Sequence, residues 1–305
     1  MKKILFLSLI LSITLSFSVT ALVLSGGGAR GFAHVGLLRV LQLYNIKPKI
    51  VIGTSAGALI GAFYACGYTP LEMMDVVKEF NKKKIMEEAF PNLPISVISW
   101  KPIEKFLYKY LGNKNIEDLK VKLAIVATNI KTGQIEIFTK GNLLKAVEAS
   151  CSIPGFFPPV KIGDNYYVDG GILLNEPTTI AHSFGADKVV LSVVSDQSLG
   201  IKKNTPYFER VFFDLLYNLR NSLSKDLNIN DMSNMLDLTM KSVDFYNFSQ
   251  FVYDRATKDV DLVLNPLNSI RGFSTVFDFK NAQKYYQFGM LNAIAHSDEI
   301  QKIFK

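Results

Sequence analysis

The chain has 305 residues, of which 49% are hydrophobic and 20% charged, a composition that is typical of a globular protein and excludes a disordered one. The formal net charge is +7. This modest surplus of positive charge favours an anionic lipid surface. The charge is not concentrated in one segment, which argues against a nucleic-acid partner. The length suits one large domain or two small ones.

Residues 1–18 have the features of a signal peptide. A basic start at Lys2 and Lys3 is followed by a mostly apolar stretch at 4–17. An uncleaved membrane anchor is the alternative, but the stretch reaches the length of a membrane span, about 20 residues, only by including 21–24. Because 21–24 is needed as a buried strand, we expect a cleaved signal peptide and an exported protein, either periplasmic or secreted.

Strands and helices alternate along the following part of the chain. Short apolar runs predict strands at 21–24, 49–53, 123–130, 165–171 and 188–195, the third with a hairpin partner after Gly133. Helices are predicted at 31–44, 55–66, 69–92 and 143–150, with one more inside 92–112. This alternation favours a parallel sheet that is covered by helices on both faces.

The C-terminal third has a different pattern. Apolar residues at helical spacing predict helices at 208–223, 232–255 and 279–304. A strand at 260–266 is expected to join the same sheet. We therefore expect three regions: a signal peptide at 1–18, an α/β core at 19–200, and a mainly helical region at 201–305 that completes the same domain.

A glycine-rich loop follows the first predicted strand. Gly26, Gly28 and Gly31 fit the G-x-G-x-x-G pattern between a strand and a helix, which is typical of dinucleotide-binding enzymes. Those enzymes hold the ribose with an acidic residue roughly 20 positions further along. This chain has no acid there, and the next is Glu72. The pattern therefore indicates a loop whose amides bind some other anion.

The second predicted strand ends in the sequence GTSAG, residues 53–57. In this position G-x-S-x-G indicates a nucleophile elbow, in which Ser55 occupies a tight turn and projects its hydroxyl from the sheet edge. Gly53 and Gly57 remove Cβ atoms that would clash in that turn. The alternative is an ordinary strand-to-helix turn that is capped by serine.

A serine nucleophile needs a base, and histidine is the usual one. The chain has three histidines, none at a strand-to-loop junction: His34 on the first predicted helix, His182 on a helix expected after Gly171, and His296 near residue 305. We expect structural or surface roles for all of them. Asp169 ends a predicted strand and precedes Gly170 and Gly171, which permit close approach of another segment. A carboxylate in contact with Ser55 would accept its proton directly. The alternative for Asp169 is an ordinary turn residue.

The two cysteines, Cys66 and Cys151, are expected to be buried free thiols, although an exported chain could pair them. Neither lies in a Cys/His cluster with the spacing of metal ligands.

Three motifs occur in order, SGGGARG, GTSAG and DGG, with ASCSIPGFFPPV just before the last. Over about 21–194 the chain resembles the bacterial branch of the patatin-like phospholipase family. The resemblance implies a three-layer α/β/α sandwich and a catalytic dyad of Ser55 and Asp169 without histidine. It also implies an oxyanion hole and glycines that support the motifs: Gly26, Gly27, Gly28 and Arg30 for the hole, and Gly31, Gly53, Gly57, Gly170 and Gly171 for support.

What the resemblance implies about activity is acyl transfer to lipids. Family members are mostly lipid acyl hydrolases without an obligatory metal or cofactor, so we expect a phospholipase A, lysophospholipase or esterase that forms an acyl-enzyme. A transacylase acting on the same lipids, or a catalytically silent exported lipid-binding protein, is the alternative. Arg30 either holds the glycine loop or attracts a substrate phosphate, and its place inside the motif favours the first role.

Several aromatic residues are candidates for lipid contact: Trp100, Phe156, Phe157, Phe212, Phe213 and Tyr217. Phe156 and Phe157 flank the expected site and are expected to line an acyl pocket. Phe212 lies on an apolar helix stripe and is expected in the core. Phe213 and Tyr217 lie off that stripe, which favours a surface that meets a membrane or a second copy of the chain.

Overall fold

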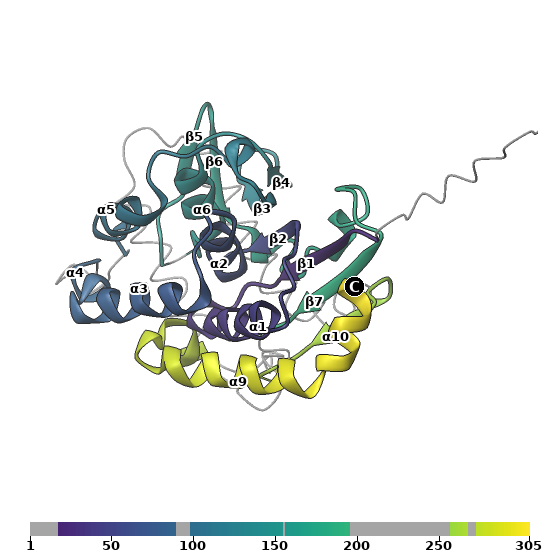
Figure 1. Cartoon of the computed structure of the whole chain (residues 1–305). Helices are drawn as coiled ribbons and strands as arrows, with labels where there is room; N and C mark the ends of the chain where they lie inside the picture. Colours follow the sequence, from purple (N-terminus) through teal and green to yellow (C-terminus); the bar gives the residue numbers. More distant parts are fainter. Residues whose placement is uncertain (1–17, 90–97, 155, 196–256, 268–272) are drawn as a thin grey trace, which may run out of the picture.

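The structure is a computed structural model that describes residues 18–89, 98–154, 156–195, 257–267 and 273–305. Within these residues eight strands form one sheet, in the order β5-β6-β3-β2-β1-β7-β8, with β4 paired to β3 (Figure 1). The strands are β1 (Thr20–Leu24), β2 (Ile50–Thr54), β3 (Lys122–Asn129), β4 (Gln134–Phe138), β5 (Val160–Ile162), β6 (Asn165–Asp169), β7 (Lys188–Ser192) and β8 (Leu262–Leu264).

The sheet is mixed and mostly parallel, as the sequence predicts. β3, β2, β1, β7 and β8 run parallel to one another, and the late strand β8 joins the sheet beside β7. β4, β5 and β6 form the antiparallel part. Because β1 and β2 pair in parallel, with Leu24 opposite Gly53, the loops that follow these two strands emerge at the same edge.

Helices cover the two faces unequally. The face with the larger hydrophobic core carries α1 (Phe32–Leu43), α2 (Ala56–Ala65), α6 (Leu143–Ser150) and α9 (Ala282–Ala295). α3 (Pro70–Lys82), α4 (Ile85–Ala89) and α5 (Trp100–Leu111) pack beyond them, and α10 (Ser297–Phe304) follows α9 (Figure 1). In the described part of the chain, the opposite face is covered by the 3-10 helix η4 (Thr178–Ile180) and the segment after it.

The two faces of β1 show how the sequence sets these layers. Leu22 and Leu24 point into the large helix-covered core, whereas Ala21 and Val23 point into the smaller opposite core. All four are fully buried. A central parallel strand is covered on both sides, which is why it reads as a continuous apolar run.

Local signals also fix where helices begin. The Thr69 hydroxyl accepts a hydrogen bond from the Glu72 amide, and the Glu72 carboxylate accepts one from the Thr69 amide, which forms a capping box at the start of α3. Pro70 then occupies the first helical position, where its missing N–H costs nothing.

Several predicted boundaries change in the structure. The predicted helix at 69–92 divides into α3 and α4, and the closing helix at 279–304 divides into η6 (Phe279–Asn281), α9 and α10, with a break at His296. The helix expected around His182 was wrong, because that residue lies in a turn after η4. The predictions at 1–17, 208–223 and 232–255, including Phe212, Phe213 and Tyr217, lie outside the described residues.

Among the helices that the structure describes, none combines the length and the apolar character needed to cross a bilayer.

Candidate active site

Ser55 sits in a strained turn between β2 and α2. Its backbone has φ 53° and ψ −119°, a conformation that L-residues rarely adopt. Strain of this kind costs of order 1–3 kcal/mol and is kept where surrounding structure enforces it. The Ser55 amide donates to Ser150 Oγ at 2.8 Å, and Ser150 Oγ donates to the Val126 carbonyl at 2.6 Å, so α6 and β3 hold the turn in place.

The two glycines that flank the turn permit close packing of backbone on backbone. A Cβ atom on Gly57 would collide with the Leu24 carbonyl at the end of β1. A Cβ atom on Gly53 would lie 2.5 Å from the backbone carbonyl group of Gly57. Backbone atoms cannot move aside as a flexible side chain can, so both positions need glycine.

The structure brings the Ser55 hydroxyl and the Asp169 carboxylate together. Ser55 Oγ donates to Asp169 Oδ2 at 2.6 Å, and both residues are buried. The second oxygen, Oδ1, accepts from the Gly171 amide at 2.7 Å, and Thr128 Oγ1 donates to the Asp169 carbonyl at 3.0 Å. The carboxylate is therefore held at both oxygens and aimed at the serine.

Burial controls the protonation of Asp169. Desolvation raises the pKa of this carboxyl to about 6 from its ordinary 3.8, while the hydrogen bonds from Ser55 and Gly171 limit the rise. At neutral pH the group is still mostly ionised. It is also a stronger proton acceptor than an exposed aspartate, as general base catalysis requires.

The glycine loop lies directly beside this pair. A Cβ atom on Gly26 would lie 3.2 Å from Ser55 Cβ, so the loop packs against the nucleophile. The Gly26 amide donates to the Asn175 carbonyl at 3.4 Å, and Gly28 lines the cavity described below. The buried Arg30 donates from Nε to the Gly27 carbonyl at 3.1 Å, the contact expected of a residue that holds the loop.

The histidines have other partners, all within the described residues. His34 lies on α1 and is buried, with Nε2 donating to the Ser25 carbonyl at 3.0 Å and Nδ1 accepting from Ser192 Oγ at 2.9 Å. Burial lowers the pKa of His34 to about 4, so it is neutral. His182 bonds to the carbonyl of Ala186, and His296 bonds to the carbonyl of Asn292, each four residues away in the sequence. The expected structural roles agree with these contacts.

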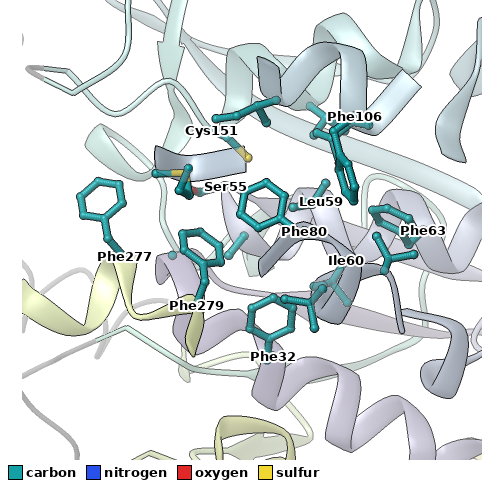
Figure 2. Close-up of a pocket in the computed structure, with 18 of the residues that line it drawn as sticks. Phe32, Ser55, Leu59, Ile60, Phe63, Phe80, Phe106, Cys151, Phe277 and Phe279 are labelled. Atoms are coloured by element: carbon teal, nitrogen blue, oxygen red, sulfur yellow. The ribbon is translucent and has the colours of Figure 1, made fainter. Parts of the chain in front are cut away.

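An apolar cavity of about 140 Å³ adjoins Ser55 (Figure 2). Its floor is one face of α2, since Ser55, Leu59 and Phe63 follow at intervals of four residues and all line it. Helical rise carries this floor about 12 Å away from Ser55. Aromatic rings from distant parts of the chain close the other sides, among them Phe32, Phe80, Phe106, Phe277 and Phe279.

The predicted aromatic contacts are partly as expected. Phe157 lines the cavity and stacks on Trp100 with ring centres 4.5 Å apart, while the Trp100 indole donates to Ser152 Oγ at 2.9 Å. Phe156 was also expected to line the cavity, but it packs against Phe277, a lining residue, with ring centres 5.0 Å apart.

Both cysteines are free thiols, and both are half-buried, which is less buried than predicted. The Cys151 side chain points toward Ser55 and lines the cavity (Figure 2). Burial raises the pKa of its thiol well above the ordinary range, so it remains protonated beside the serine. Among the described residues, no group of three His, Cys, Asp or Glu side chains could hold a metal ion.

Sequence reasoning missed three residues that shape the site: Ser150, Asn175 and Glu176. Ser150 braces the elbow, Asn175 packs against Gly26 of the glycine loop, and the buried Glu176 accepts a hydrogen bond from the Asn175 side chain. Only their positions in the chain pointed to these residues. Ser150 ends a predicted helix ahead of the DGG motif, and Asn175 follows that motif by four residues.

A serine hydroxyl bonded to a carboxylate, beside an apolar cavity, is the arrangement of a nucleophilic serine next to a binding site for an apolar group. Residues 22–182 match the family described as patatin-like phospholipase. Because that match covers more than half of the chain, the protein belongs to the patatin-like phospholipase family.

Individual relatives are distant. The Lysophospholipase NTE1 of Debaryomyces hansenii is 27% identical over 92% of this chain, which spans 18% of the yeast protein's length. An uncharacterized protein of Bacillus subtilis, YqhO, is 33% identical over 51% of this chain and 64% of its own length. Among solved structures, VipD from Legionella pneumophila is 16% identical, with a TM-score of 0.45 over 92% of this chain and 67% of that one.

Proposed function

We propose that this protein cleaves acyl esters of phospholipids or lysophospholipids through an acyl-enzyme on Ser55. The observation that carries the proposal is the 2.6 Å hydrogen bond from Ser55 to Asp169 at the edge of the apolar cavity. The name of the yeast relatives, lysophospholipase, supports a lipid substrate.

In the first half of the reaction, Asp169 takes the Ser55 proton as Oγ attacks the ester carbonyl. The leaving alcohol takes that proton from Asp169, and the acyl group stays on Ser55. In the second half, water attacks the acyl carbonyl, Asp169 accepts a proton from the water, and the proton passes to Ser55 as the fatty acid leaves. Asp169 thus acts as base and acid in turn.

The oxyanion that forms at each attack needs hydrogen-bond donors. We assign this role to the amides of Gly27 and Gly28, because the Gly26 amide already donates to Asn175 and Gly28 lines the cavity. Loss of one such donor typically costs about 3 kcal/mol of transition-state stabilisation. Arg30 acts through the loop, by bonding to the Gly27 carbonyl.

The cavity is suited to the acyl chain. An apolar cavity of about 150 Å³ in a protein stays dry and takes up a small apolar molecule. The cavity beside Ser55 has a similar volume of about 140 Å³. An acyl chain lying along α2 would replace water contacts with contacts to Leu59 and Phe63.

The test is fatty-acid release from defined phospholipid and lysophospholipid vesicles. We expect release by the native protein and its loss in Ser55→Ala and Asp169→Asn, with Asp164→Asn, an exposed aspartate on the β5–β6 turn, as the matched control. A fluorophosphonate probe should label Ser55. Unchanged release in Ser55→Ala or Asp169→Asn would contradict the dyad.

We also propose that the protein is exported and meets its substrate at a bilayer surface. The basic and apolar N-terminal segment at 1–18 and the net charge of +7 support this. N-terminal sequencing of exported material should begin near residue 19, and an intact Met1 there would contradict cleavage. Sedimentation with anionic vesicles, but not with neutral ones, should recover the protein.

A further inference from the structure

The segment that follows Asp169 returns to the active site at Asn175. Thr54 Oγ1 donates to the Leu174 carbonyl at 2.9 Å, and the Gly26 amide donates to the Asn175 carbonyl at 3.4 Å. The backbone of Leu174 and Asn175 is therefore tied to the residue before the nucleophile and to the glycine loop. Neither bond uses the Asn175 side chain, which is left to point elsewhere.

The orientation of the Asn175 carboxamide is fixed by Glu176. Asn175 Nδ2 donates to Glu176 Oε1 at 2.7 Å, and Ser195 Oγ donates to the same oxygen at 2.8 Å. Glu176 is buried, so this pairing is shielded from water. The amide nitrogen of Asn175 therefore faces Glu176, whose Oε1 accepts from it. The carboxamide oxygen, Oδ1, therefore faces the opposite way.

What Oδ1 faces is the active site. A Cβ atom on Gly26 would collide with it and would lie 3.2 Å from Ser55 Cβ. A Cβ atom on Gly171 would lie 2.9 Å from Asn175 Oδ1 and 3.0 Å from Asp169 Oδ1. Two oxygen acceptors, one from a neutral carboxamide and one from a carboxylate, thus approach Gly171, and the first of them also approaches Gly26 beside Ser55.

We infer that Asn175 is a catalytic residue for deacylation, and that its Oδ1 and the Asp169 carboxylate together hold the attacking water. The inference rests on the acyl-enzyme proposed above. Water has two hydrogens, and two acceptors fix both of them, which aims an oxygen lone pair at the acyl carbonyl on Ser55. The new C–O bond forms as Asp169 takes one proton, and the Ser55 ester bond then breaks as Oγ takes that proton.

This arrangement distinguishes water from an alcohol. An alcohol has one hydroxyl hydrogen, which Asp169 accepts, so it gains nothing from a second acceptor. Asn175 therefore favours hydrolysis over transacylation by orienting the nucleophile with two hydrogens. Loss of Oδ1 removes that advantage from water alone.

The experiment compares the full-length native protein with Asn175→Ala, using p-nitrophenyl butyrate with and without methanol. We expect acylation to persist as a burst of nitrophenolate, deacylation to fall about tenfold, the effect of one lost hydrogen bond, and an acyl adduct on Ser55 to accumulate in intact-mass spectra. The ratio of methyl ester to free acid should rise about tenfold. Equal loss of both half-reactions, or an unchanged product ratio, would overturn the inference.

Thr54→Val is the matched control, since it removes the hydrogen bond to Leu174 and loosens the same segment while keeping the Asn175 side chain. It should not raise the ratio of ester to acid, and a rise equal to that of Asn175→Ala would also overturn the inference. Titration of Ser55 with a fluorophosphonate gives the fraction of folded sites in each variant. A native protein that is never labelled would instead refute the proposed acyl-enzyme itself.

Discussion

The hydroxyl of Ser55 donates to Asp169 Oδ2 at 2.6 Å, although 114 residues separate the two in the chain. Transfer of the serine proton along this contact needs the Asp169 carboxylate in its ionised form, because a protonated carboxyl group cannot act as a base. Burial raises the pKa of Asp169 to about 6. Activity should therefore report the titration of this single group.

We expect kcat/KM for a neutral ester to rise with pH, to reach half its maximum near pH 6, and to stay level above about pH 7, since the base is then fully ionised. His34 does not titrate in this range, because burial lowers its pKa to about 4. A pH profile in buffers of constant ionic strength measures this. A midpoint near pH 4 would show that Asp169 is not desolvated.

Asp169→Asn should abolish turnover but stabilise the fold at neutral pH. A carboxyl with a raised pKa costs folding stability once it ionises; the cost is absent below about pH 4, grows as the pH rises toward 6, and is full above that. A shift from 3.8 to about 6 corresponds to about 3 kcal/mol. Asparagine can accept from the Gly171 amide and donate to Ser55 Oγ, so it keeps both contacts without the charge.

Urea unfolding of the native protein and of Asp169→Asn, at pH 4 and at pH 7.5, measures that difference. The variant should gain up to about 3 kcal/mol at the higher pH and little at the lower one. Because all other carboxyls are common to both proteins, their titration cancels. Parallel pH dependences in the two proteins would contradict the assigned pKa.

The strained turn at Ser55 gives a second stability prediction. Ser55→Ala and Ser55→Gly both remove the hydroxyl that bonds to Asp169, but only glycine adopts φ 53° and ψ −119° without strain. Ser55→Gly should therefore be more stable than Ser55→Ala by about 1–3 kcal/mol. Chemical denaturation of the two inactive variants tests this, and equal midpoints with equal slopes would mean that the turn is not strained.

The floor of the cavity predicts acyl-chain preference. Leu59 lies one turn beyond Ser55 on α2, and its side chain lines the cavity. Leu59→Trp should fill the space next to the nucleophile, so hydrolysis of long-chain esters should fall by tenfold or more, roughly the effect of losing a few methylene contacts. Hydrolysis of an acetyl ester should change little. Uniform loss across chain lengths would place the acyl chain elsewhere.

Sequence alone predicted the parts of the site that depend on local chain geometry. GTSAG and DGG must lie at strand ends, because the glycines beside Ser55 and Asp169 serve tight turns, and the structure has both there. The apolar character of β1 and β2 predicted two buried strands of a parallel sheet. Their pairing, which the structure shows, brings the glycine loop beside the elbow.

The remaining parts depend on contacts between segments that no periodicity reports. Ser150 is an ordinary helix-terminal serine until β3 supplies the carbonyl of Val126 and the elbow supplies the Ser55 amide. Asn175 gains its place only when Glu176 is buried against Ser195. The turn at His182 replaced an expected helix because the segment after Asp169 forms short 3-10 turns against the sheet.

The ends of the described chain meet. Thr20 Oγ1, at the start of β1, donates to the carbonyl of Ile303, 283 residues later, and α9 packs along α1. Contacts of such long sequence separation slow folding, and they leave the apolar side of α1 uncovered while the chain is being synthesised. Phe277 and Phe279, which close the cavity, are also made late. We therefore expect a nascent chain to acquire its ester-cleaving activity only after α9 and α10 have been synthesised.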